Sequence, residues 1–299
     1  MAFKESLKRF ISMQFNRLTA VIIGNLRTLQ KKILAQTLPL SGYKPGLKSH
    51  VDVLSDEDLI ELNGLLDWNS FISDANGRRF GMVAWGTKRI EPQEIPDKRI
   101  VAMHERFNLS GQHVLEVGCF EGVHTLGLLQ YAVKVTAVDS RVDHVVKTMV
   151  RCGMHEKSLI VFRCDVESKS QNYSLLACDY IHHVGVLYHL RDPVSHLLAL
   201  KHYVKKGVML DTHYALPNDA KSSYNVDGRD YSYKRYMEYG KKESFSGMYD
   251  HSKWLLLDDI VDCLKQSGFD NVEIVEKRAE RNGPRVLLYA SKVKTAQLN

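Results

Sequence analysis

The sequence lacks the features that would place it in the most easily recognised classes of protein. Its five cysteines are odd in number and scattered, which favours free thiols in a reducing compartment over a disulfide framework. No apolar run approaches the roughly 20 residues that span a bilayer, and no signal peptide is visible. Internal repeats and low-complexity tracts are also missing. We therefore expect a cytoplasmic, globular protein.

Most of the chain also lacks an excess of positive charge. The formal net charge is +6, but residues 1–50 carry nine Lys and Arg and a single Glu. Residues 51–299 then hold 32 basic and 34 acidic side chains, a balance of −2. A surface that follows nucleic-acid phosphates would normally make the folded body basic. The distribution makes nucleic acid a less favoured partner.

The basic N-terminal segment has the pattern of an amphipathic helix. Apolar residues recur every three or four positions from Phe3 to Ile33, with Lys and Arg between them. Residues 1–50 are therefore expected to form a basic helical extension. Residues 1–36 could pack on the chain's own domain, self-associate, or lie on an anionic membrane surface, which would make the protein peripheral to the membrane. Residues 51–109 predict a helical and irregular cap, with a helix capped by Ser55.

From residue 110 to residue 299, short apolar runs alternate with helical stretches of about 10 to 15 residues. This alternation predicts an α/β domain with a mostly parallel sheet of seven strands covered on both faces. The last two runs, 271–277 and 285–292, are joined by a short turn and predict an antiparallel hairpin. A segment of about 215–252, rich in tyrosine, interrupts the alternation and is expected to form a lid over the site.

The first βα turn, "HVLEVGCFEGVHTLGLL" at 113–129, carries the main functional signal. It lacks the G-x-G-x-x-G pattern of dinucleotide sites, because Phe120 and Val123 occupy the second and third glycine positions. Gly118 and Gly122 still allow a ligand to approach the backbone. Glu116, two residues before Gly118, would repel a pyrophosphate but suits a cationic amino group.

Further acids follow the next strands. Asp139 ends the second strand, where a carboxylate can bind two ribose hydroxyls. Asp165 ends the third strand, within reach of an adenine amino group, and Asp179 opens the fourth. A ligand with a ribose, an adenine, an amino group and no phosphate is S-adenosylmethionine.

These motifs, "EVGCFEG", "AVDS" and "RCDVE", resemble those of class I S-adenosylmethionine-dependent methyltransferases. The resemblance implies a Rossmann-like fold over 112–291, with S-adenosylhomocysteine as the product. Phe120 departs from the usual third glycine and leaves the loop conformation open. The residues expected to bind the cofactor are Glu116, Gly118, Cys119, Phe120, Gly122, Asp139, Ser140, Asp165, Val166 and His183.

The segment "GVLYHLRDPVSHLLAL" resembles the tRNA wobble-uridine carboxymethyltransferase family and its bacterial relatives. That family uses carboxy-S-adenosylmethionine, which we consider the less favoured cofactor here. Its extra carboxylate would need a cation, and the candidates by position are Lys88, Arg89, Lys98 and Arg99. Other segments, "DTHY" and "NGPR" among them, resemble relatives associated with surface-glycan and natural-product clusters.

The chemistry should occur beyond the fourth and fifth strands, where a base can accept a hydroxyl proton. A neutral imidazole suits that task. The candidate catalytic residues are His183, His189, His213, Asp211 and Tyr188, with His182 beside them. Asp211 and His213 lie on one face of a strand, but a third metal ligand is not evident, so we predict no metal site.

The sequence therefore predicts an S-adenosylmethionine-dependent methyltransferase that O-methylates a glycan, a glycolipid or a small-molecule hydroxyl. One alternative is a tRNA-modifying (carboxy)methyltransferase. Another is a scaffold that has kept the fold without catalysis.

Overall fold

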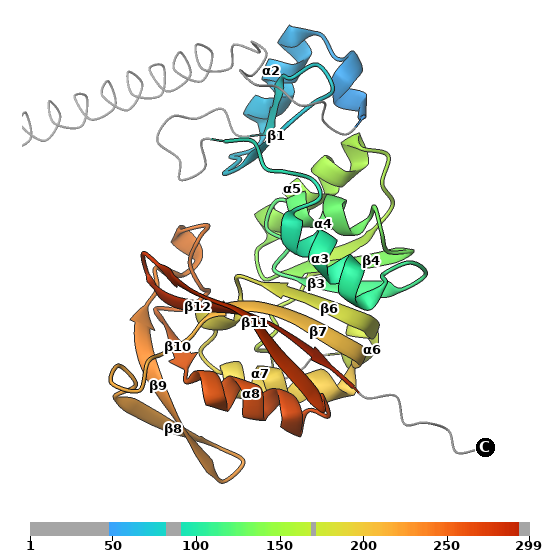
Figure 1. Ribbon diagram of the computed structural model, residues 1–299. Helices are drawn as coiled ribbons and strands as arrows, with labels where there is room; N and C mark the ends of the chain where they lie inside the picture. The colour runs from blue at the N-terminus through green and yellow to red at the C-terminus, as the bar shows by residue number, and fades with distance from the viewer. Residues whose placement is uncertain (1–47, 82–90, 169–171, 293–299) are drawn as a thin grey trace, which may run out of the picture. The chain divides into compact units, whose positions relative to one another are not determined.

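The structure, a computed structural model, describes residues 48–81, 91–168 and 172–292 (Figure 1). The predicted N-terminal extension, including the segment 1–36, lies outside the described residues apart from its last three positions. The chain divides into two compact units, one that ends at Gln93 and one that begins at Glu94.

The first unit contains short elements held together by one arginine. Its elements are η1 (His50–Val53), α2 (Asp56–Leu65), β1 (Phe71–Ser73) and β2 (Arg79–Gly81). Ser55 caps α2 as predicted, because its hydroxyl accepts a hydrogen bond from the Asp58 N–H at 3.1 Å. The Arg78 guanidinium bonds the carboxylates of Asp74 and Asp56, both at 2.9 Å, and so ties the β1–β2 turn to the start of α2.

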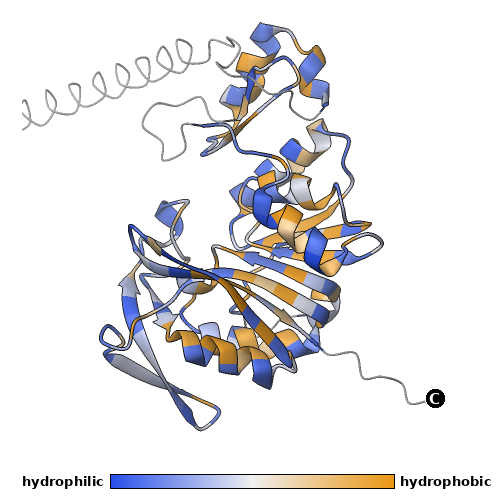
Figure 2. Ribbon diagram, viewed as in Figure 1, coloured by the Kyte–Doolittle hydropathy of each residue, from blue (hydrophilic) through white to orange (hydrophobic). Residues whose placement is uncertain are grey.

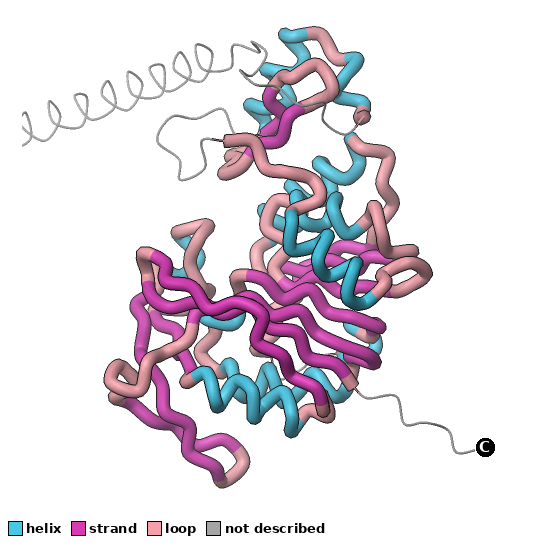
Figure 3. Tube along the Cα trace, in the orientation of Figure 1, coloured by secondary structure: helices cyan, strands magenta, loops and turns pink. Residues whose placement is uncertain are grey.

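The second unit is built on the predicted seven-stranded sheet, drawn as arrows in Figure 1 and in magenta in Figure 3. Its strands are β3 (His113–Val117), β4 (Lys134–Asp139), β5 (Ile160–Arg163), β6 (Cys178–Val184), β7 (Val204–His213), β11 (Asn271–Glu280) and β12 (Gly283–Ser291). Their spatial order is β11-β12-β7-β6-β3-β4-β5, with β12 antiparallel to both of its neighbours. The fold class and the antiparallel C-terminal hairpin are thus confirmed.

Helices cover both faces of this sheet. The helices described in this unit are α3 (Lys98–Phe107), α4 (Val123–Leu128), α5 (Val142–Met154), α6 (Tyr173–Leu176), α7 (Pro193–Ala199) and α8 (Leu257–Gln266), with short η2 (Leu187–His189) and η3 (Leu200–His202), and η4 (Gly240–Lys242) within the insertion. Ile100 and Met103 of α3 pack on one face, and Leu197 of α7 and Leu264 of α8 pack on the other. The apolar stripes along the strands are visible in Figure 2. Helix α3 belongs to this unit, although the sequence placed it in the cap of 51–109.

The predicted insertion forms a separate three-stranded antiparallel sheet. Its strands are β8 (Ser222–Val226), β9 (Arg229–Met237) and β10 (His251–Leu255). Strand β10 extends past residue 252, so the insertion is slightly longer than predicted. Trp254 in β10 is buried, which anchors this sheet to the domain.

Among the residues that the structure describes, no helix is long and apolar enough to cross a membrane.

Candidate active site

The turn after β3 has the backbone of a glycine-rich loop despite its phenylalanine. Gly118, Phe120 and Gly122 all have positive φ, at 77°, 51° and 79°. A Cβ at Gly118 would lie 2.3 Å from Cγ2 of Val186, and one at Gly122 would lie 3.0 Å from Cα of Thr148. Phe120 therefore follows a path that usually requires glycine.

Two side chains of this turn close its interior. The Thr148 hydroxyl lies 3.3 Å from Sγ of Cys119, and burial raises the pKa of the Cys119 thiol well above its usual value. Cys119 is therefore a neutral, packed thiol rather than a reactive one. The Phe120 ring lies against His144 and Phe245, and Phe245 belongs to the insertion. The turn is thus in direct contact with the predicted lid.

Asp139 holds the end of β4 against this turn. Its carboxylate accepts hydrogen bonds from the N–H groups of Phe120 at 3.1 Å and Arg141 at 2.9 Å, and His144 Nδ1 lies 3.2 Å away. Its neighbour Ser140 accepts a bond from Nε of Arg163 at 3.1 Å. These contacts fix the position of the carboxylate at the carboxyl end of β4, and its contact with a ribose stays a prediction.

Asp165 and Val166 follow the end of β5 at the same edge of the sheet. Oδ1 of Asp165 accepts the N–H of Glu167 at 3.1 Å, and Val166 packs against the core. Asp179 does not belong to this group. It begins β6 at the opposite edge, where it accepts the N–H of His113 at 3.0 Å. Three of the four acids in the predicted series therefore share one edge.

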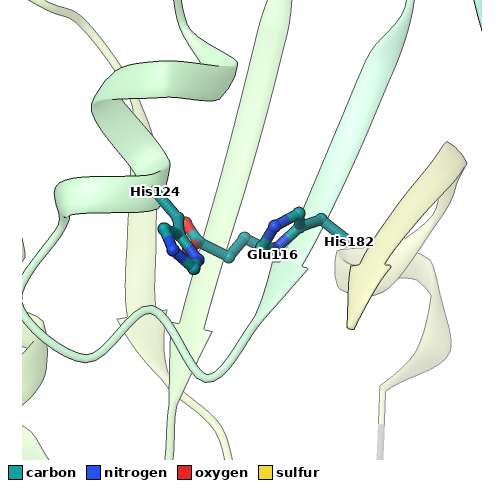
Figure 4. Close-up of side chains that lie close together, drawn as sticks. All are labelled: Glu116, His124 and His182. Atoms are coloured by element: carbon teal, nitrogen blue, oxygen red, sulfur yellow. The ribbon is translucent and has the colours of Figure 1, made fainter. Parts of the chain in front are cut away.

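The described residues contain one group of three side chains close enough to share a bound cation. Glu116, His124 and His182 place their polar atoms within 4.8 Å of one another, and Figure 4 shows them pointing toward a common centre. Glu116 and His182 are cross-strand partners on β3 and β6, and His124 lies in the first turn of α4. The sequence analysis considered Asp211 and His213, predicted no metal site, and did not identify this group.

The charges around this group favour a zwitterionic ligand over a metal ion. Two histidines and a glutamate are a donor set for divalent transition metals. However, Nε2 of His124 already lies 3.3 Å from Nη2 of Arg99 and 3.6 Å from Oδ2 of Asp97, so that nitrogen is occupied. Arg99 is also paired with Asp97 and Asp211, and a zwitterion whose cationic group lies beside Glu116 suits this mixture of charges.

Burial sets the protonation of the two central groups. It raises the pKa of Glu116 to about 8, although a hydrogen bond from the Thr125 hydroxyl at 2.5 Å acts to lower that pKa. It also lowers the pKa of His182 well below the usual range, helped by the charges of His124 and Arg99. Neither ring nitrogen of His182 has a partner among the described residues. A buried polar ring without a hydrogen bond is costly, so this site is suited to a polar ligand.

His183 does not lie with this group, because successive residues of a strand face opposite sides of the sheet. Its fully buried ring faces α7, where its Nε2 lies 2.9 Å from Nε2 of His196. Burial lowers its pKa well below the usual range. His183 forms part of the core, and we withdraw it as a candidate base and as a cofactor contact.

Asp211 is also unsuited to act as a base. It is fully buried, and its carboxylate bonds Arg99 at 3.1 Å, Arg278 at 2.9 and 3.0 Å, and also Arg285. Burial alone would raise its pKa, but the three guanidinium groups lower it below the ordinary value. Asp211 therefore holds three arginine side chains in place and is unsuited to accept a proton. Arg99 was expected near the site from its position, whereas Lys88 and Arg89 lie outside the described residues.

His213 and Tyr188 form part of an aromatic wall. The His213 ring stacks on Trp254 at 4.8 Å, and Trp254 stacks on Tyr236 at 4.6 Å. Tyr188 meets His213 edge to face at 4.7 Å. Nδ1 of His213 donates to the Pro284 carbonyl at 3.1 Å, which fixes the ring orientation. This wall joins the end of β7 to the insertion.

His189 lies at the end of η2 and pairs with the insertion. Its Nδ1 is 2.7 Å from Oε1 of Glu238, a residue that follows β9. Sequence reasoning missed Glu238, as it missed His124 and Trp254, because nothing local marks them and only the fold brings them to the site.

Comparisons with known proteins agree with this geometry. The family model described as a methyltransferase domain matches residues 89–274. A tRNA U34 carboxymethyltransferase from Alteromonas mediterranea is 27% identical over 177 residues, 56% of this chain and 48% of that protein, so the chain spans about half the length of this curated relative. The N-terminal domain of EvdMO1, crystallised with SAH bound, has a TM-score of 0.64 at 21% identity and covers 79% of this chain and 95% of its own. The same domain in the presence of SAH and D-fucose has a TM-score of 0.63, again at 21% identity over the same shares. At that identity the likeness shows the fold alone.

Proposed function

Because the chain belongs to the methyltransferase-domain family, we propose that it transfers a methyl group from S-adenosylmethionine to a hydroxyl oxygen of a sugar-containing or other small acceptor. When bound, S-adenosylmethionine supplies a methyl group already activated by its sulfonium. The protein then has to align the acceptor oxygen and receive its proton.

The cofactor assignment rests on one observation above all. The buried ring of His182 has no hydrogen-bond partner among the described residues, and it lies beside Glu116 and His124. The amino and carboxylate groups of a methionine would meet Glu116 on one side, and His124 with Arg99 on the other. Asp139 then takes the ribose, and Asp165 with Val166 borders the adenine. Gly118, which has no Cβ, lets Val186 pack against the turn between them.

The acceptor assignment rests on the aromatic wall. His213 and Tyr236 stack against the buried Trp254, and Tyr188 and Tyr236 are the half-buried rings that border this stack. Aromatic faces pack on the C–H faces of sugar rings, while nearby polar groups bind hydroxyls. A neighbour of the same fold was crystallised in the presence of SAH and D-fucose, which is the pair of ligands that this proposal requires.

The test combines binding with turnover. Calorimetric titration with SAH should show affinity near micromolar. Methyl-labelled S-adenosylmethionine is then incubated with a panel of methyl glycosides, nucleotide sugars and simple phenols, and label in a product ether is measured. We expect label on a sugar. A folded protein that does not bind SAH would overturn the cofactor assignment, and binding without turnover on any acceptor would point to a scaffold.

The second candidate is a tRNA wobble-uridine (carboxy)methyltransferase, favoured by the likeness over 177 residues and by the position of Arg99. It predicts that carboxy-S-adenosylmethionine binds more tightly than S-adenosylmethionine, and that Arg99→Leu abolishes this preference. It also predicts that RNase treatment of a cell extract destroys the acceptor. Equal affinity for both cofactors would reject it.

A further inference from the structure

A histidine–glutamate pair joins the body of the domain to the insertion. His189 follows the loop after β6, and its side chain is 20% exposed. Its Nδ1 lies 2.7 Å from Oε1 of Glu238. A carboxylate only accepts hydrogen bonds, so Nδ1 is the nitrogen that donates to Glu238, and Nε2 is left for another partner. No residue of the described ranges is hydrogen-bonded to that Nε2.

Glu238 is held more firmly than an ordinary surface acid. Besides His189, its carboxylate accepts bonds from the Ser246 hydroxyl at 2.6 Å, the Gly247 N–H at 2.8 Å and the Ser252 hydroxyl at 2.9 Å. Burial alone would raise the pKa of Glu238, but these donors lower it below the ordinary value. Glu238 is therefore an ordered anion at neutral pH.

The insertion also fits closely around His189. A Cβ on Gly247 would lie 2.5 Å from the His189 carbonyl oxygen and 3.4 Å from Cδ of Glu238. Only glycine lets this turn approach, so the pair exists only when the insertion is packed on the loop after β6. The pair therefore depends on the packing of the insertion against this loop.

The other candidate bases are occupied, protonated or misplaced, apart from His182, which is assigned above to the cofactor site. Asp211 is bound by three arginines, and His213 is fixed by the Pro284 carbonyl and stacked on Trp254. Burial raises the pKa of the Tyr188 hydroxyl, which makes it a poor base. His183 faces the opposite side of the sheet. His189 combines an available nitrogen with a carboxylate that orients it.

We propose that His189 is the general base of the methyl transfer and that Glu238, supplied by the insertion, is its positioning residue. This assignment rests on the proposed function. As the bond from the acceptor oxygen to the methyl carbon forms and the carbon–sulfur bond breaks, the hydroxyl proton passes to Nε2 of His189. The sulfonium becomes a neutral thioether, and Glu238 stabilises the imidazolium. The insertion thereby couples closure over the acceptor to the assembly of the base.

The experiment compares His189→Gln, Glu238→Gln and Glu238→Asp with wild type on the best acceptor of the panel. His189→Gln should lower kcat roughly 10²- to 10⁴-fold, the usual contribution of a positioned base. Glu238→Gln keeps the shape but removes the charge, so it should lower kcat about 10²-fold with KM little changed. Glu238→Asp should recover part of the activity.

Two controls separate this assignment from a general loss of structure. Asp227→Asn is the same acid-to-amide change at an exposed turn of the insertion, and it should leave kcat unchanged. SAH affinity by calorimetry should stay within about twofold of wild type in every variant. Wild-type activity combined with full activity of His189→Gln or Glu238→Gln would overturn the assignment and leave the proposed function standing. If wild type methylates no acceptor, the proposed function fails and this role of His189 fails with it.

Discussion

The two halves of the sheet's carboxyl edge are built in different ways. In the half formed by β3, β4 and β5, main-chain groups carry the geometry: Asp139 accepts the N–H of Phe120, 19 residues away. In the half formed by β6, β7, β12 and the insertion, side chains carry it. Arg99 reaches Asp211 across 112 residues, and His189 reaches Glu238 across 49. A site held by main-chain groups tolerates many side-chain substitutions, whereas a site held by side-chain contacts can be lost through one substitution.

The largest effect is expected from removing the charge of Asp211, which lies in the half built from side-chain contacts. Asp211→Asn leaves Arg99, Arg278 and Arg285 without their shared anion. Breaking a buried ion pair on one side usually costs about 3–5 kcal/mol of unfolding free energy. Urea denaturation at pH 7 measures that loss. Asp250→Asn, whose side chain is 76% exposed, should leave the urea midpoint nearly unchanged.

The pH dependence of this effect has a definite sign. The pKa of Asp211 is lower in the folded protein than in the unfolded chain. Its contribution to stability is therefore complete above the unfolded pKa and is lost as the pH falls through the folded pKa. The difference between wild type and Asp211→Asn should shrink below about pH 4. A constant difference across pH 3–7 would contradict the ion-network interpretation.

In the half built from main-chain groups, the substitution with the largest expected effect is at Asp139. Asp139→Ala removes the acceptor for the N–H groups of Phe120 and Arg141 and the proposed ribose contact. Because hydrogen bonds to a charged group contribute about 1.5–3 kcal/mol each, SAH affinity should fall roughly 100-fold or more. Calorimetry measures it, with Asp143→Ala as the matched control, since that side chain is 56% exposed. Undiminished binding in Asp139→Ala would show that the ribose lies elsewhere.

Arg141 links the two halves, so a substitution there tests whether the insertion depends on the half that binds the cofactor. Its guanidinium donates to the carbonyls of Gly240, Lys241, Glu243 and Ser246 at 2.8–2.9 Å. A lysine has no planar fork to reach all four. Arg141→Lys should therefore speed hydrogen exchange of the amides in 238–247 about tenfold, since a loss of about 1.4 kcal/mol opens a segment tenfold more often. Arg235→Lys, 53% exposed in the same insertion, should leave exchange as it is; equal rates in both variants would refute this link.

The smallest effect concerns the proton on Glu116. With a pKa of about 8, Glu116 is mostly protonated at pH 7, and the ammonium group of SAH should displace that proton. Calorimetry in phosphate and in Tris buffer at pH 7 should reveal the release of close to one proton for each SAH bound. Glu116→Gln should abolish it, while Glu105→Gln, exposed on α3, should not.

Glu116 also affects stability with a sign opposite to that of Asp211. Its folded pKa lies above the ordinary 4.5, so the folded state holds a proton that the unfolded chain has released. Stability should therefore fall as the pH rises between about 4.5 and 8, and Glu116→Gln should flatten that slope. An unchanged slope in the variant would place the titrating group elsewhere.

Sequence reasoning was effective where structure depends on nearby residues. The alternation of apolar runs predicted all seven strands and their hairpin, because burial on both faces of a parallel sheet leaves a periodic signal. The turn at Gly118–Gly122 was identified from its glycines, and even Phe120 has the positive φ that its position demands. The prediction was less accurate for His183, because one residue of strand register decides which face a side chain occupies.

By itself, then, the sequence determined the fold class, the family and the residues that follow each strand of the cofactor half. Only the tertiary structure decided that Asp211 binds three arginines, that His183 is part of the core, and that Glu238 meets His189. The physical reason is the range of the interactions. Strand periodicity and turn geometry act over a few residues, whereas an ion pair or an aromatic stack forms between any two segments that the fold happens to bring together.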